Sequence, residues 1–467
     1  DSDTFATELR SGTIQTLSNG ALGSGTIYYT RTDKNDQTPA IEFANDVDIA
    51  NDIVLSGNSV PMILSGTSGT LSGRLSANNS NANEIVLRLN EGESLTLTNT
   101  SVVTDDEGTH SNGLGNSVYS YRLESGDLIA KVDSFATEVG DLALRYWYSS
   151  IGNASITNAG DNKLTFLLNT DDSNGGLKFS NNLVMESGWL TLGETIQEGD
   201  VSPVGSIYYG GSTSGNGGFR VDVGNGTTVY VSGSLSHGYT DIASGTLDVS
   251  HSSDGSVFLG GLSSDGDGVL AVGSKNITVG FDNGDLTYNG KIVADEEGAN
   301  IVKTGNGSWT LNLTDDSNVK SVDIASGSFS LGENHLDGGL FQNNDMEIRI
   351  GANGTFKHVT KDGSLLVLDN LNASTSGGSI VLGNEDELLL SSQNSSSKIA
   401  ANLVGNGWLF LENLSSDGEN VDAWELSGNN SGWGGVIAAF GNGAKINLNS
   451  ASAGSSSSSI NFGALGN

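Results

Sequence analysis

The sequence predicts an all-β fold, a right-handed parallel β-helix (β-solenoid) that runs as one elongated domain through residues 1–467. Apolar and polar residues alternate in short runs, as in strands with one buried side. Turns rich in Gly, Asn, Ser and Asp separate these runs about every ten residues. The runs also recur in sets of three. Because no run is long enough to cover its own apolar side, the sets must stack on one another.

The clearest set lies at residues 301–340. A Gly-Asn-Gly turn precedes three strands predicted at SWTLNL, VKSVDI and SFSLGE. Parts of this set are copied elsewhere, because TDDSN occurs at 314–318 and 170–174, and DIASG at 323–327 and 241–245. Such copies indicate a repeating structural unit rather than a biased composition.

Strand triplets favour parallel coils over antiparallel hairpins, since each coil can then hydrogen-bond to the coils on both sides of it. Repeats of this kind have roughly 20–25 residues per coil. Residues 102–150 depart from the pattern, and we expect an insertion or irregular section there. Four apolar residues in it recur at helical intervals, which favours a short helix; they are Phe135, Val139, Leu142 and Tyr146.

The charge balance limits the partners of the chain. There are 55 acidic and 20 basic residues, a net charge of −35. A nucleic-acid partner is therefore not expected, and approach to anionic lipid is disfavoured. No apolar run of about 18 residues is present, so we expect no direct membrane insertion. The absence of cysteine fits a protein exported without disulfide bonds. The chain starts with Asp rather than Met, which leads us to expect that an N-terminal segment has been removed.

The 303–331 segment resembles a known repeat. KTGNGSWTLNL followed by DIASGSFSLG is similar to the autotransporter-associated β-strand repeat, whose pattern is K-T-G-x-G-x-L-x-L and a later G-x-L-x-L strand. Seven residues carry the match: Lys303, Thr304, Gly305, Gly307, Gly327, Phe329 and Leu331. The resemblance implies a right-handed parallel β-helix on the surface of a bacterium, or shed from it, like an autotransporter passenger. The translocator barrel of that family has no counterpart in this sequence.

Known reaction motifs give little support for an enzyme. A serine hydrolase needs a nucleophile on a strained turn beside a histidine and an acid, but no G-x-S-x-G occurs, and the five histidines stand apart in the sequence. They are His110, His237, His251, His335 and His358. A polysaccharide lyase or hydrolase would need converging carboxylates. The candidate pairs are Asp171 with Asp172, Asp315 with Asp316, and Glu296 with Glu297. The duplication of TDDSN with the scaffold argues against catalysis, because a unique site should not be copied. We expect no catalytic, cofactor-binding or metal-binding residues and no cofactor.

Two other features could bind a ligand. Asp265 and Asp267 flank Gly266 in a turn similar to those of calcium-binding β-rolls, although an ordinary solvated turn is the preferred interpretation. Tryptophans could stack on sugars, but core packing is expected for most of them. Trp189, Trp309 and Trp408 are predicted to pack in the core or at the end of a coil, whereas Trp147 is the expected ligand contact.

These observations predict a non-catalytic, extracellular or cell-surface structural protein. Neither end shows a capping helix, and GALG occurs at 20–23 and 463–466, so the partner expected first is a second copy stacked head to tail into a filament or layer. An adhesin that binds host or matrix glycans is the first alternative. A polysaccharide lyase or hydrolase is the second.

Overall fold

The structure is a computed structural model, and it divides into two compact units, Asp1–Asp254 and Gly255–Asn467, which we describe separately. It describes residues 7–30, 38–44, 46–55, 61–73, 75–77, 84–97, 102–105, 108–111, 120–125, 127–132, 155–158, 163–168, 177–179, 182–185, 189–194, 206–209, 213–215, 218–222, 228–231, 234–280, 284–314, 317–336, 346–368, 370–391, 398–412, 424–440, 446–448 and 459–462.

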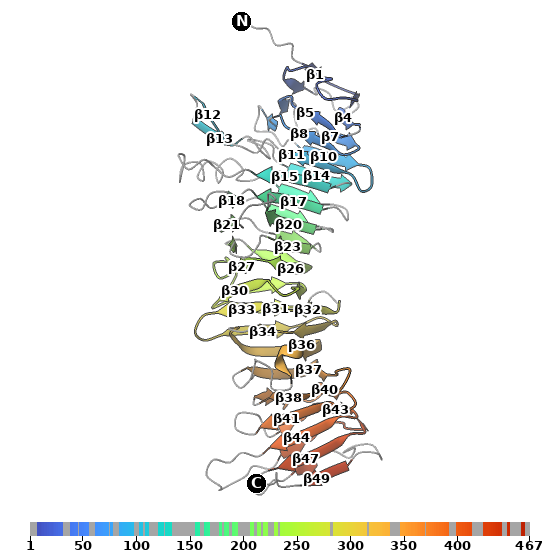
Figure 1. The fold of residues 1–467 in the computed structure, drawn as a ribbon, viewed down its shortest axis with the longest axis vertical. Coiled ribbons are helices and arrows are strands. Elements are labelled where there is room, and N and C mark those ends of the chain that lie inside the picture. Colours follow the sequence, from blue (N-terminus) through green and yellow to red (C-terminus); the bar gives the residue numbers. More distant parts are fainter. Residues whose placement is uncertain are drawn as a thin grey trace. The chain divides into compact units, whose positions relative to one another are not determined.

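Both units are built almost entirely from parallel strands. Successive coils of the chain lie beside one another in sequence order, as the colour gradient within each unit shows (Figure 1). Hydrogen bonds between side chains on neighbouring coils span 27 residues from Gln15 to Glu42 and 23 residues from Asn289 to Asn312. The predicted parallel β-helix is therefore confirmed, although some coils are longer than the expected 20–25 residues.

In the first unit, four parallel sheets run along the stack of coils. The first sheet contains β1 (Thr7–Leu9), β3 (Ile27–Tyr29), β6 (Ile53–Leu55) and β9 (Leu75–Ala77). The second contains β2 (Thr13–Thr16), β4 (Ala40–Phe43), β7 (Met62–Gly66), β10 (Glu84–Leu89), β14 (Ser120–Ser125), β16 (Ser155–Asn158), β19 (Asn182–Met185), β22 (Thr213–Gly215) and β25 (Leu235–His237). The third contains β5 (Val47–Ile49), β8 (Gly69–Leu71), β11 (Ser94–Leu97), β15 (Asp127–Val132), β17 (Lys163–Leu168), β20 (Trp189–Glu194), β23 (Gly218–Asp222) and β26 (Tyr239–Ser244), and the fourth contains β18 (Leu177–Phe179), β21 (Ser206–Tyr209), β24 (Thr228–Val231) and β27 (Thr246–Asp248).

The section at 102–150 contains an exception to parallel pairing. Strands β12 (Val102–Asp105) and β13 (Gly108–Ser111) form an antiparallel hairpin that lies beside the stacked strands (Figure 1). Strands β14 and β15 then return to the parallel ladder. The helix expected from Phe135 to Tyr146 falls outside the described residues.

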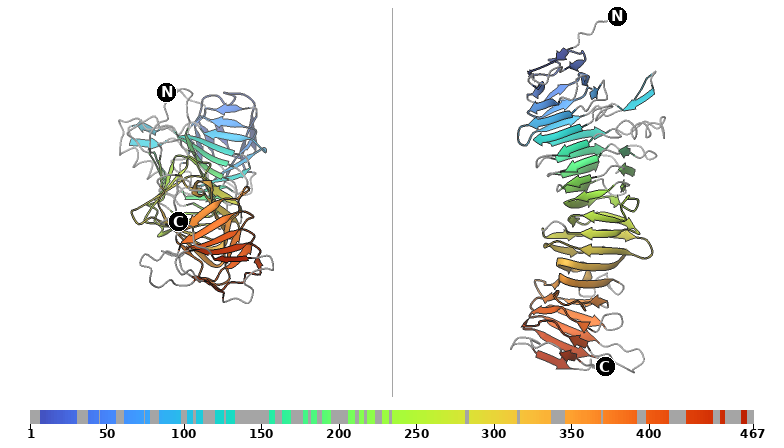
Figure 2. Two further views of the ribbon diagram at one scale, coloured as in Figure 1. Left: turned by 60° about the horizontal axis from the view of Figure 1, so that its bottom comes forward. Right: turned by 180° about the vertical axis from the view of Figure 1, so that it is seen from behind.

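The second unit continues the parallel pattern. Its strands are β28 (Ser256–Leu259), β31 (Asn276–Val279), β34 (Ala299–Lys303), β36 (Val319–Leu331), β37 (Glu347–His358) and β39 (Leu371–Asn372); β29 (Leu262–Ser263), β32 (Leu286–Tyr288), β35 (Ser308–Leu311), β40 (Ser379–Leu382), β43 (Asn402–Gly405) and β46 (Gly432–Trp433); β30 (Val269–Gly273) and β33 (Lys291–Ala294); β38 (Leu365–Leu368), β41 (Glu387–Ser391), β44 (Trp408–Glu412), β47 (Val436–Phe440) and β49 (Ser459–Phe462); and β42 (Lys398–Ile399), β45 (Trp424–Leu426) and β48 (Ile446–Leu448). Figure 2 shows the ladder from β38 to β49 from behind.

The reference set differs from its prediction in one respect. VKSVDI and SFSLGE were expected as two strands, but they form the single strand β36, which pairs first with β34 and then with β35. A register shift between Ile324 and Ser326 and a positive φ at Gly327 let this strand turn the corner of the coil without a break.

The core lies inside each coil and follows the alternation in the sequence. In β35 the side chains of Trp309 and Leu311 are buried, while Ser308 and Thr310 lie on the outer side. The only helix among the described residues is a 3-10 turn, η1 (Glu333–His335). No described helix is long and apolar enough to cross a membrane.

Tyr288 places a polar group in this core. Its hydroxyl is fully buried at the end of β32, and its one proton is shared between the carbonyl oxygens of Gly268 (3.2 Å) and Lys291 (2.9 Å). Burial raises the pKa of Tyr288 well above its ordinary value, because the phenolate would lose its hydration.

Tyr288→Phe is expected to reduce the loss of stability at alkaline pH. In the unfolded chain tyrosine ionises near pH ~10, whereas folded Tyr288 stays protonated. The stability that Tyr288 contributes is thus complete below about pH 10 and is lost as the pH rises above that value. At neutral pH the variant should be less stable by about 0.5–1.5 kcal/mol, the usual contribution of a hydrogen bond.

Urea unfolding across the alkaline range would measure this difference. Tyr28→Phe is the matched control, because Tyr28 lies on the outer side of β3, and its pH profile should follow that of the unmodified chain. Equal alkaline slopes for Tyr288→Phe and the unmodified chain would contradict the assignment.

Candidate functional site

Several of the residues that resemble the autotransporter repeat meet at one corner of the coil, around the buried side chain of Lys303. Lys303, the last residue of β34, is only 1% exposed and points inward. Its Nζ donates hydrogen bonds to three carbonyl oxygens, those of Thr304 (2.6 Å), Gly305 (3.4 Å) and Ser326 (3.3 Å). Ser326 belongs to the next coil. Burial lowers the pKa of Lys303. The amine therefore ties two coils together at the corner where the chain turns.

Two glycines of the same motif allow the backbones to approach each other. Gly305 and Gly327 have φ values of 71° and 72°, which favour glycine. A Cβ atom on Gly327 would lie 2.4 Å from the carbonyl oxygen of Gly305 and 2.6 Å from that of Gly307. The glycines that carry the resemblance are therefore required by this close stacking of two turns.

An aromatic row crosses the core next to this corner. Trp309 and Phe329 have ring centroids 5.7 Å apart, and Phe329 and Phe356 are 6.4 Å apart. All three side chains are buried, and the indole Nε1 of Trp309 donates to the carbonyl oxygen of Leu262 (3.1 Å). The motif position taken by Phe329 thus supports packing between coils, and the core placement predicted for Trp309 is confirmed.

A second buried polar cluster was not predicted from the sequence. The Asp386 carboxylate is fully buried and accepts hydrogen bonds from the backbone N–H of Thr360 (2.9 Å) and of Ser364 (3.1 Å), and from the Thr360 hydroxyl. His358 lies beside it, with Nε2 3.0 Å from the Ser364 carbonyl oxygen and 4.0 Å from Asp386 Oδ1.

The geometry of this cluster is that of a turn anchor. A Ser–His–Asp triad uses the two ring nitrogens of histidine for two different partners. Here the Ser364 hydroxyl (3.5 Å), the Ser364 carbonyl oxygen and Asp386 all face the same nitrogen of His358. Asp386 instead satisfies the backbone donors of the turn between β37 and β38.

Two of the other histidines have described side chains. His335 is buried, and its Nε2 accepts the backbone N–H of Leu313 (3.1 Å). His251 is exposed and contacts Ser250 and the edge of Tyr230. His110 and His237 lie on β13 and β25, and their side chains are outside the described set.

Of the acidic pairs predicted from the sequence, one can be placed. Glu296 and Glu297 are exposed in the turn between β33 and β34. The pairs at 171–172 and 315–316 lie outside the described residues.

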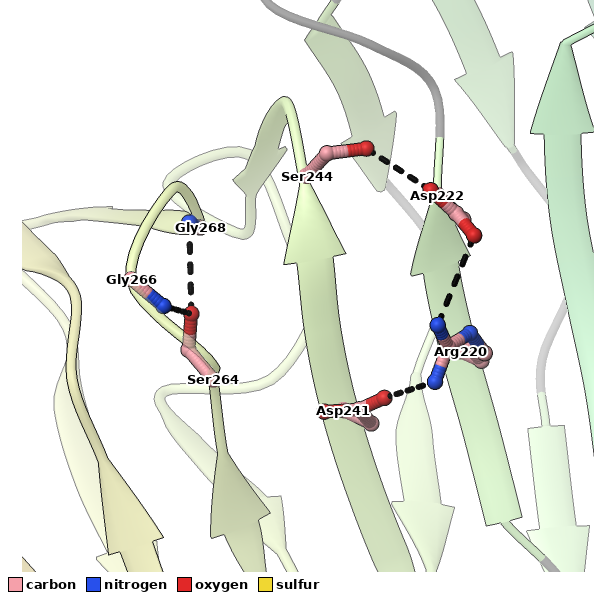
Figure 3. Close-up of polar contacts among 7 residues, drawn as sticks. All are labelled: Arg220, Asp222, Asp241, Ser244, Ser264, Gly266 and Gly268. Atoms are coloured by element: carbon pink, nitrogen blue, oxygen red, sulfur yellow. Dashed lines mark hydrogen bonds and ion pairs between the residues drawn. The ribbon is translucent and has the colours of Figure 1, made fainter.

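Acids on the outer strand surfaces are often paired with arginine on the next coil. Arg220 contacts Asp241 (2.5 Å) and Asp222 (3.4 Å), and Ser244 donates to Asp222 (2.8 Å), which forms a polar ladder across β23 and β26 (Figure 3). Arg349 likewise bonds Asp323 and Glu347, and Arg88 bonds Glu124.

The turn considered for calcium is closed by its own side chain. Ser264 Oγ accepts hydrogen bonds from the backbone N–H groups of Gly266 (3.4 Å) and Gly268 (3.2 Å), as Figure 3 shows. Asp265 and Asp267 are both exposed. Within the described part of the chain, no three His, Asp or Glu side chains gather closely enough to hold a metal ion.

The tryptophan predictions have mixed outcomes. Trp424 and Trp433 are buried, and their indole N–H groups have no hydrogen-bond partner among the described residues. Trp408 was predicted to pack in the core or at a coil end, but it is 41% exposed on the outer side of β44. Trp408 directly follows its Gly-Asn-Gly turn, whereas one serine separates Trp309 from the equivalent turn. A shift of one residue along a strand moves a side chain to the opposite side of the sheet. Trp147 and the side chain of Trp189 lie outside the described set.

Trp408 belongs to an apolar outer surface, which we call the outward strip. Residues of β38, β41, β44 and β47 that point away from the core meet there in register. Trp408 and Val367 (38%) are exposed, Ala438 is buried, and the other members are half-buried. The members of the strip are Leu365, Val367, Leu389, Trp408, Phe410, Val436, Ala438 and Phe440.

Three aromatic rings form a continuous row in the outward strip. The ring centroids of Trp408 and Phe410 are 5.9 Å apart, and Phe410 stacks on Phe440 at 5.3 Å with an interplanar angle of 28°. Strand register places Glu387 beside Trp408 and Glu412 beside Phe440. Neither glutamate forms an ion pair with another described residue, in contrast to the arginine-bound acids above. The row is thus apolar in the middle and negatively charged at both ends.

The sequence analysis does not predict the outward strip, because it assumes that apolar and polar residues alternate in every strand. The segments LLVL, WLFL and VIAAF are in fact unbroken apolar runs, which predict a strand that is apolar on both sides. A solvent-facing apolar surface of this kind indicates an interaction site.

Comparison with known proteins finds no relative. No protein-family model matches the chain, and no curated protein or solved structure is significantly similar to it. The β-solenoid fold therefore stands on the strand pairing itself.

Gly327→Ala is expected to destabilise the chain strongly. It combines a positive φ with a Cβ atom that meets two carbonyl oxygens, and each form of strain costs about 1–3 kcal/mol. Two controls separate these causes. Gly23 has nearly the same φ (70°) but nothing within 4 Å of its Cβ position, and Gly255 has open space and no positive φ.

Chemical unfolding should therefore rank the loss of stability as Gly327→Ala above Gly23→Ala, with Gly255→Ala near zero. If Gly327→Ala cost no more than Gly23→Ala, the close stacking of the two turns would be refuted.

Proposed function

We propose that this chain is a non-catalytic structural β-solenoid of the bacterial cell surface or extracellular space, which assembles head to tail with copies of itself. The observation that supports this most directly is that buried polar side chains form hydrogen bonds with the backbone of the neighbouring coil. Asn51 donates to the carbonyl oxygens of Gly23 and Gly25, Lys303 to that of Ser326, and Asn430 Oδ1 accepts the backbone N–H of Leu403. These polar groups hold one coil to the next.

The ladder also provides a mechanism for assembly. Every coil presents the same kind of parallel hydrogen-bonding edge to its neighbour, so a second copy can extend the ladder with geometry already used inside the chain. The net charge of −35 opposes this association at low salt. The resemblance of residues 303–331 to the autotransporter-associated repeat supports the surface location.

Electron microscopy of the purified full chain, over a series of protein and salt concentrations, tests the assembly. Filaments or layers should grow with protein concentration and with ionic strength, because salt screens repulsion between acidic copies. Sedimentation velocity should show the same trend. Single particles of uniform size at every salt and protein concentration would rule out the head-to-tail contact.

The outward strip favours a second candidate, an adhesin. An apolar surface of several contiguous side chains outside a solenoid is suited to an external partner. The ligand class expected from the sequence is a host or matrix glycan. A polysaccharide lyase or hydrolase is a further alternative, and loss of reducing-end release on replacing a single acid would be its signature.

Glycan-array binding by variants of Trp147 and Trp408 would show which of the two surfaces binds the glycan, if the chain is an adhesin. Loss of binding in Trp147→Ala alone would place the glycan at the residue first chosen from the sequence. A loss of about tenfold or more in Trp408→Ala, with Trp147→Ala unaffected, would place it on the outward strip. Absence of binding to any glycan by the unmodified chain would rule out the glycan adhesin.

A further inference from the structure

The outward strip offers two equivalent positions for a cation. Trp408 and Phe440 stand at the two ends of the aromatic row, and each has a glutamate directly beside it on the next strand, Glu387 and Glu412 respectively. Cross-strand neighbours of this kind have Cβ atoms about 5 Å apart. A group bound there can contact a ring and a carboxylate at the same time.

From this pairing we propose that the outward strip binds a polypeptide segment that carries two arginine residues separated by apolar residues. The inference rests on the adhesin candidate and names the chemistry of its partner. A guanidinium group stacks on an aromatic face and bonds a carboxylate through its planar fork, so it satisfies both groups at each end of the row. The apolar residues between the arginines cover Phe410 and its neighbours.

The charge pattern of the molecule selects this partner over others. Arg88, Arg220 and Arg349 neutralise acids elsewhere on the described strands, whereas Glu387 and Glu412 have no described cation beside them. A second copy of this chain would bring the same two carboxylates and more negative charge against the strip. Acidic glycans and anionic lipids would be repelled in the same way. A basic partner supplies the positive charge that Glu387 and Glu412 lack among the described residues.

Titration calorimetry of the full chain at physiological salt tests this assignment. The probe is a short synthetic peptide of alternating arginine and leucine, and a peptide with glutamine in place of arginine is its neutral counterpart. We expect binding of the arginine peptide only. Trp408→Ala should weaken it about tenfold, within the range of a cation–π contact that excludes water. The double variant Glu387→Gln, Glu412→Gln should weaken it by a similar factor.

Matched variants control for non-specific attraction to an acidic protein. Glu296→Gln with Glu297→Gln removes the same charge from an exposed turn, and Phe258→Ala removes an outward aromatic side chain from β28. Both should bind the peptide within about twofold of the unmodified chain. The substitutions are on outer surfaces, so circular dichroism should show the unmodified fold in each variant.

Equal weakening by the controls and by the strip variants would overturn the inference, because binding would then follow net charge alone. If a neutral oligosaccharide bound in a Trp408-dependent manner while the arginine peptide did not, the inference would fail and the adhesin candidate would survive. If neither probe bound, both would fail.

Discussion

The structure depends on the hydrogen-bond ladder between successive parallel coils. No strand of this chain could bury its apolar side alone, because most have three to six residues. Each coil is stable only because the coils on both sides satisfy its backbone groups and close the core above and below. The ladder therefore accounts for the alternation in each strand and for the recurrence of the same turn residues.

The hydrogen-bond ladder is hardest to maintain at the corners of the coil, where the chain changes direction. Strand β36 turns a corner without ending, and three features make this possible: the register shift after Ile324, the positive φ of Gly327, and the Lys303 amine that bonds carbonyl groups of both coils. A buried ammonium group without a described carboxylate nearby is costly in an apolar core. Three carbonyl acceptors at the corner offset that cost, and they explain why the lysine and the glycines occur together.

Much of the fold could be predicted from the sequence, but less of the candidate site. Alternation and repetition in SWTLNL and its copies predict strands, parallel stacking and the burial of Trp309, because these depend on local pattern. The exposure of Trp408 depends on one residue of register after a turn. The Asp386 cluster depends on a contact between residues 26 positions apart, which no short motif reveals. The outward strip did have a sequence signal, its unbroken apolar runs, which matches strands with apolar residues on both sides.

The spacing of the coils has an evolutionary consequence. Hydrogen bonds such as Asn289 to Asn312 and Asn384 to Asn406 join equivalent positions 23 and 22 residues apart, and each joins adjacent coils. Gain or loss of a whole coil by recombination would therefore create one new junction and leave the remaining contacts in place. Insertion of half a coil would instead break the ladder. Genes of this kind can thus vary in length by whole turns.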